Sequence, residues 1–203
     1  MTGPRRMRIS LGAAMLLLPL AAAPARSQDR PQTLPSRDVD ITYRLGQINP
    51  ATAPGIIEQR MRWDVTGGRL RVDPPTPGLY VILDTRNHHM TTVREADHAV
   101  LELDGMGGAN APVPGSPPVD NGIPFIREGE SRIASLTCTE WETKDLAGAP
   151  ALVCITDDGV LLRAVTAGRT VLEATKVTYG PIDPSVFQVP ANYVRLHPPP
   201  PAR

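Results

Sequence analysis

The chain has 203 residues, with 21 basic and 21 acidic side chains, two cysteines and few aromatic residues. The formal net charge of zero argues against a nucleic-acid-binding protein, which usually needs a basic patch to meet phosphates. No apolar run reaches the ~18 residues of a membrane-spanning helix, so we expect no transmembrane segment in the mature chain. The length allows one domain.

The first 27 residues have the pattern of an export signal. Arg5, Arg6 and Arg8 form a positive start, residues 11–20 are an apolar core, and small residues lead to a cleavage site near Ser27. The sequence therefore predicts an exported, periplasmic protein. The pair Arg5-Arg6 leaves the twin-arginine route open beside ordinary Sec export.

Cys138 and Cys154 are the only cysteines, and both survive the expected cleavage. An oxidising destination makes a disulfide between them the default prediction. A redox pair usually has two residues between its cysteines, and a metal site needs further ligands nearby, so both alternatives are weaker.

The first half of the mature chain alternates polar and apolar residues. Residues 28–37 are polar and interrupted by prolines, which predicts a disordered lead-in. The period of two that is typical of half-buried strands then recurs, with glycines at the first hairpin turn. The expected strands cover residues 38–45, 59–65, 69–72, 79–84, 89–94 and 99–103. A weak helical stretch is expected over residues 55–58.

Residues 105–122 contain many glycines and prolines and no period, which predicts a flexible loop. Alternation resumes afterwards, in expected strands at residues 132–141, 151–156, 160–165 and 170–179. Asp183 can cap a single helical turn over 184–187, and residues 197–203 form a proline-rich tail. These features predict one all-β domain over 38–196, with nine or ten antiparallel strands and almost no helix.

Several of these segments together resemble the lipoprotein-localisation (LolA-like) superfamily. They are an export signal, a meander with Tyr43 and Met61-Arg62-Trp63, the cysteine segment 137–163, and a closing Asp-Pro-x-x-Phe-x-x-Pro-x-x-Tyr pattern from Asp183 to Tyr193. The resemblance implies a strongly curved antiparallel sheet, or half-barrel, with an apolar concave side. In carrier members of the superfamily that side holds acyl chains under covering helices, and this sequence offers no long helix for that purpose.

An apolar sheet face must be kept away from water. A second layer can cover it, the sheet can close on itself into a barrel or sandwich, or a ligand can bind to it. The residues expected to form a ligand-binding part of this face are Tyr43, Met61, Trp63, Leu70, Val72, Leu101 and Leu103. Two functions follow from this face. The first is a non-enzymatic periplasmic protein that binds a lipid or another apolar ligand, and the alternative is an envelope interaction module with a filled core and a protein partner.

Catalytic signals are weak, and no cofactor is expected. The sequence has no nucleophile elbow, no metalloprotease motif and no phosphate loop. Glu140, Glu142 and Asp145 surround Trp141 and form a weak acid–base candidate. His89 and His98 are weak metal candidates, because two adjacent strands can bring them together. Four arginines on one polar face can bind an anion or can simply face solvent, namely Arg60, Arg62, Arg69 and Arg71.

Overall fold

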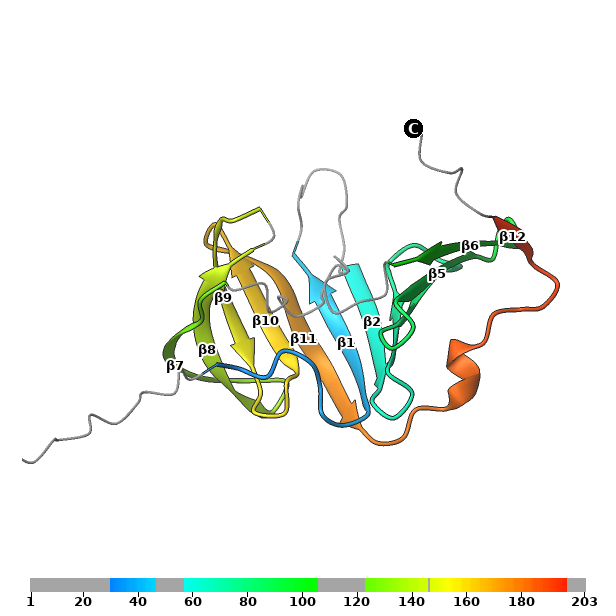
Figure 1. Ribbon diagram of the computed structural model, residues 1–203. Helices are drawn as coiled ribbons and strands as arrows, with labels where there is room; N and C mark the ends of the chain where they lie inside the picture. The colour runs from blue at the N-terminus through cyan, green and yellow to red at the C-terminus, as the bar shows by residue number, and fades with distance from the viewer. Residues whose placement is uncertain (1–29, 47–56, 106–122, 146, 197–203) are drawn as a thin grey trace, which may run out of the picture.

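The chain forms one large curved sheet that does not close into a barrel (Figure 1). The computed structural model describes residues 30–46, 57–105, 123–145 and 147–196. The expected signal peptide, most of the 105–122 loop and the proline-rich tail lie outside these residues. Over the described residues the all-β prediction is confirmed, with twelve strands in place of nine or ten.

The first half of the chain is an antiparallel meander of six strands. They are β1 (Val39–Leu45), β2 (Ile57–Asp64), β3 (Arg69–Asp73), β4 (Leu79–Asp84), β5 (His89–Arg94) and β6 (Ala99–Asp104). Each of the six occurs where alternation predicts a strand. Ile57 and Glu58, expected in a weak helical stretch, belong to β2.

The second half adds five antiparallel strands, a short 3-10 turn and a final short strand. They are β7 (Ile126–Ile133), β8 (Leu136–Lys144), β9 (Pro150–Ile155), β10 (Leu161–Thr166), β11 (Arg169–Tyr179), the turn η1 (Pro184–Phe187) and β12 (Val194–Leu196). β12 pairs in parallel with β6 at one edge of the sheet, and β7 forms the other edge.

Two strands of the structure are absent from the sequence prediction. Residues 132–141 are expected to be one strand, but the chain reverses at Ala134 and Ser135 to make the β7–β8 hairpin. Both residues have positive φ, 47° and 67°, a conformation that usually calls for glycine or asparagine in such turns. The sequence therefore carries no turn signal there. β12 has only three residues, too few for a visible period.

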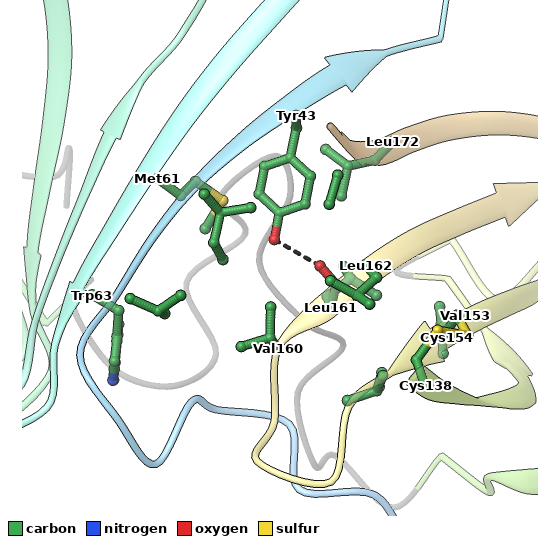
Figure 2. Close-up of a cluster of buried hydrophobic side chains, with 14 of the residues drawn as sticks. Tyr43, Met61, Trp63, Cys138, Val153, Cys154, Val160, Leu161, Leu162 and Leu172 are labelled. Carbon is green, nitrogen blue, oxygen red and sulfur yellow. Dashed lines mark hydrogen bonds between the residues drawn. A yellow bond between two sulfur atoms is a disulfide. The ribbon is translucent and has the colours of Figure 1, made fainter. Parts of the chain in front are cut away.

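β1 and β11 pair in the centre of the sheet and join its two halves. β2 to β6 extend from one side of this pair, and β10 to β7 extend from the other. Because the sheet is curved, side chains from both halves meet in one main core (Figure 2). The core includes Tyr43, Trp63, Val160, Leu161 and Leu172, each at most 7% exposed.

A second, smaller core lies on the other face of β4, β5 and β6. It contains Tyr80, Ile82, Val93, Val100 and Phe187. Asp183 accepts a hydrogen bond from the Ser185 backbone N–H at 2.9 Å, which confirms the predicted cap of η1. The segment after β11 thus returns along the sheet and covers this face (Figure 1).

Residues 30–37, which we call the N-terminal strap, belong to the lead-in expected over 28–37. They have no regular secondary structure, but they contact the turn between β9 and β10. The Ser36 N–H donates to the Asp158 carbonyl at 2.9 Å, and Arg37 forms an ion pair with the Asp158 carboxylate at 2.7 Å. A side-chain carbon at Gly159 would lie 2.2 Å from the Leu34 carbonyl oxygen, so the strap passes where only glycine fits.

Within the residues described here, no helix is both long enough and apolar enough to span a bilayer.

Candidate functional site

The structure divides the predicted apolar face into two parts. Tyr43, Met61, Trp63, Leu70 and Val72 lie in the main core and are between 1% and 7% exposed. Side chains of the protein itself pack this part. Figure 2 shows Tyr43 and Trp63 of the first half in one cluster with Val160, Leu161 and Leu172 of the second half.

Leu101 and Leu103 lie outside both cores and are half-buried. The strand register places Leu103 beside Met90, which pairs with Leu83, and Leu101 beside Thr92, which pairs with Val81. Side chains two residues apart on a strand share a face. The half-buried apolar side chains of this face form what we call the outer strip: Val81, Met90, Leu101 and Leu103.

The outer strip is continuous with the main core, because Val81 and Met90 pack against that core. From there the strip extends across β4 and β5 to β6. The sequence places Leu101 and Leu103 on the correct face, but their weaker burial cannot be seen from the pattern. It depends on how far the sheet curves at its β6 end.

The predicted disulfide is confirmed. Cys138 on β8 and Cys154 on β9 are bonded, with their Cα atoms 5.5 Å apart. Cys154 pairs directly with Glu140, and Cys138 lies two residues before Glu140 on β8. Cys138 and Cys154 are therefore diagonal neighbours on the same face of the two strands. The bond therefore ties together two neighbouring strands.

The structure separates Trp141 from the acids of the acid–base candidate. Trp141 is 4% exposed and packs in the main core, whereas Glu140 and Glu142 alternate with it and lie on the opposite face of β8. Asp145 accepts hydrogen bonds from the backbone N–H groups of Ala147 and Ala149, so it organises the β8–β9 turn. The aromatic ring cannot serve as a platform between these acids.

The opposite face of β7 to β10 carries a groove that sequence reasoning missed. Its volume is about 630 Å³, and Glu128, Glu140, Glu142, Leu152 and Val165 are among its lining residues. The only sequence signal is the placement of Glu140 and Glu142 on one side of a strand. Only the strand register with Leu152 and Val165 shows that apolar side chains lie beside these two glutamates.

The two candidate metal ligands do not converge. His89 pairs with Asp104 at one end of the β5–β6 hairpin, and its Nδ1 lies 2.8 Å from Oδ1 of that acid. His98 lies in the turn at the other end, where its ring packs edge-on against Tyr193 at 5.1 Å. Among the described residues there is no group of three or more His, Cys, Asp or Glu side chains placed to hold a metal ion.

The four arginines of the polar face lie where alternation places them, and each pairs with an aspartate. Arg60 pairs with Asp40, and Arg69 pairs with Asp64 at 2.7 Å. Arg62 and Arg71 share Asp73. Since carboxylates of the chain already neutralise these guanidinium groups, the anion-binding interpretation loses its support.

The strap contact gives Asp158 an unusual environment. Burial would raise the pKa of this carboxyl group, but hydrogen bonds from Thr156, Arg37 and Tyr179 outweigh burial and hold the pKa below its usual value of 3.8. The Arg37 guanidinium also stacks over the Tyr179 ring, 4.0 Å from its centre. This network fixes the strap to the turn between β9 and β10.

Comparison with known proteins identifies the fold. No protein-family model and no curated sequence matches the chain. An uncharacterised conserved protein from Thermus thermophilus matches with a TM-score of 0.56 and 15% identity, over 80% of this chain and 91% of that chain.

MucB matches with a TM-score of 0.53 and 12% identity, over 79% of this chain and 60% of that chain. The MucA/MucB complex of Pseudomonas aeruginosa matches with a TM-score of 0.51 and 13% identity, over 77% of this chain and 56% of that chain. At these identities the likenesses concern the fold alone. Since MucB has a LolA-like all-β fold, they support the fold that the sequence resemblance implied.

Proposed function

We propose that this protein is a non-enzymatic, exported protein of the cell envelope that binds an apolar ligand, such as an acyl chain, along the outer strip. The observation that carries this proposal is the uneven burial of one continuous apolar face. Its inner part is packed by the chain's own side chains, whereas Leu101 and Leu103 remain half-buried.

Half-buried leucines in a row are suited to an acyl chain, because each methylene removed from water contributes about 0.8 kcal/mol. The outer strip runs across β4 to β6, so a ligand there lies across the strands and extends the main core. The disulfide is consistent with export, since such bonds persist in oxidising compartments.

The experiment is native mass spectrometry of the mature protein purified from the periplasm without detergent, followed by organic extraction. We expect a bound mass of lipid size that is lost on extraction. The extracted protein should then bind the fluorescent fatty acid cis-parinaric acid with a saturable signal. A ligand-free mass together with no uptake of the probe would refute the proposal.

Two variants locate the site. Leu103→Asn places a polar group in the outer strip and should weaken binding of the probe about tenfold, roughly the effect of losing one well-buried aliphatic contact. Val171→Asn changes an apolar residue on β11 that is 42% exposed and lies far along the sheet, and it should leave binding unchanged. Equal loss in both variants would mean that the probe binds elsewhere.

The second candidate function is an envelope interaction module. The filled inner part of the apolar face favours it, because a packed core needs no ligand. One of the matching structures is a complex of MucB with MucA, so a protein of similar fold takes a protein partner. Retention of a protein partner by a lipid-free sample would favour this candidate.

A further inference from the structure

The groove on the outer face of β7 to β10 combines an apolar floor with acidic walls. Leu152 and Val165 pair across β9 and β10 and are half-buried, so they present aliphatic surface to the groove. Glu142 pairs with Leu152 from the neighbouring strand, and Glu128 projects from the irregular part of β7. We call this site the acidic groove.

Charge within the acidic groove is only partly compensated. Glu140 accepts hydrogen bonds from the Ser131 hydroxyl at 2.7 Å and from the Arg163 guanidinium at 2.5 Å. Glu128 and Glu142 are exposed, and in the described part of the chain neither has a basic partner. Within that part, two glutamates without an ion pair therefore border an apolar surface, and Lys144 lies at the end of the groove, where it pairs with Pro150.

The groove is also held in shape before any partner arrives. Cys138 and Cys154 tie β8 to β9 on the same face as Glu140, which lines the groove. The ion pair between Glu140 and Arg163 links β8 to β10 across β9. A rigid surface loses little conformational entropy on binding, which favours recognition of a flexible segment.

We infer that the acidic groove is a docking site for an extended basic segment of a partner protein. A lysine or arginine of that segment pairs with the two exposed glutamates while a neighbouring aliphatic side chain covers the apolar floor. Fatty acids and nucleic acids carry the wrong charge for this surface. The groove lies on the face opposite to the outer strip, so this inference is independent of the apolar ligand proposed above.

The test uses fluorescence anisotropy with a labelled peptide of sequence Gly-Leu-Lys-Leu-Lys-Leu-Gly. We expect saturable binding that weakens as salt is raised from ~0.05 M to ~0.5 M, because surface ion pairs are screened. A peptide with Glu in place of Lys should not bind. A peptide with Ser in place of Leu should bind at least several-fold more weakly, because it cannot cover the apolar floor.

The double variant Glu128→Gln/Glu142→Gln should weaken binding about fivefold to tenfold, the sum expected for two exposed ion pairs. Both residues are exposed, so the fold should persist, and circular dichroism checks this. Glu58→Gln, at an exposed acid on β2, is the matched control and should leave binding unchanged.

Three results would overturn the inference: no binding to the unaltered protein at ~1 mM, equal binding by the double variant, or equal binding of the Ser-containing peptide. Uptake of cis-parinaric acid is measured on the same samples. The double variant should retain that uptake, so failure of the docking site and failure of the apolar-ligand proposal can be told apart.

Discussion

The hydroxyl of Tyr43 donates a hydrogen bond to the carbonyl oxygen of Leu161 at 2.7 Å, although 118 residues separate the two (Figure 2). Tyr43 lies on β1 and Leu161 begins β10, with β11 between these strands in the sheet. The bond therefore crosses the concave side and does not follow the sheet. Burial raises the pKa of Tyr43, so the hydroxyl keeps its proton and remains a donor.

Replacing Tyr43 with phenylalanine should lower the free energy of unfolding by about 1–2 kcal/mol. The ring still fills its place in the core, but the Leu161 carbonyl loses its buried donor. Urea unfolding followed by circular dichroism measures the change. Tyr193→Phe keeps its ring packed on His98 and should change stability by less than about 0.5 kcal/mol. Equal stability of both variants would show that the cross-sheet bond contributes nothing.

Removal of the disulfide with Cys138→Ala/Cys154→Ala should lower the free energy of unfolding by about 3 kcal/mol. The bond closes a loop between residues 16 positions apart, and its loss raises the conformational entropy of the unfolded chain. Guanidinium unfolding of the variant, and of the unaltered protein with and without a reducing agent, measures the effect. Intact mass should show the oxidised protein two hydrogens lighter than the dithiol. Two reactive thiols in the untreated protein would contradict the prediction.

Gly159→Ala should release the N-terminal strap. The added carbon would meet the Leu34 carbonyl oxygen at 2.2 Å, and Gly159 has a φ of 90°, which alanine adopts only with strain. Hydrogen exchange at residues 30–37 should become faster. Gly168→Ala is the control, since it has a φ of 71° but nothing within 4 Å of an added carbon. Gly168→Ala should introduce backbone strain without releasing the strap. Release of the strap in both variants would mean that the close approach of Leu34 to Gly159 is irrelevant.

The strap should also detach in acid. The pKa of Asp158 is below its usual value of 3.8 in the folded protein, so its ionised form stabilises the strap above about pH 4. That stabilisation is lost as the pH falls through the lowered pKa, because protonation weakens the bonds from Arg37 and Tyr179. Hydrogen exchange of the strap between pH 2 and pH 6 measures this. Asp158→Asn should exchange rapidly even at pH 6, and protection equal to that of the unaltered protein would contradict the assignment.

Alternation alone predicts the fold class and the side of the sheet on which most core residues lie. It succeeds for Tyr43, Met61 and Trp63 because a period of two fixes a face wherever that face is buried. It fails at Ala134 and Ser135, where the structure imposes a turn that the residue types do not signal. It also fails for His98, which lies in the β5–β6 turn and is held away from His89 by antiparallel pairing.

The second core and the acidic groove could not be predicted for a different reason. Phe187 and Val186 cover β4 to β6 only because the chain after β11 returns to the far end of the sheet. The groove depends on the register between Glu142, Leu152 and Val165, which come from three strands. Local sequence carries neither the return path nor the register.

The central pairing of β1 with β11 sets the order in which the protein can fold. Arg44 on β1 forms an ion pair with Glu173 on β11, 129 residues later, so the middle of the sheet is formed by segments far apart in the chain. Hairpins such as β4–β5 close over short loops and can form early. The central pair forms only after β11 has been synthesised and released, which makes folding slow for a protein of this size. Until then β1 presents one bare edge, and we expect chaperones to protect the emerging chain there.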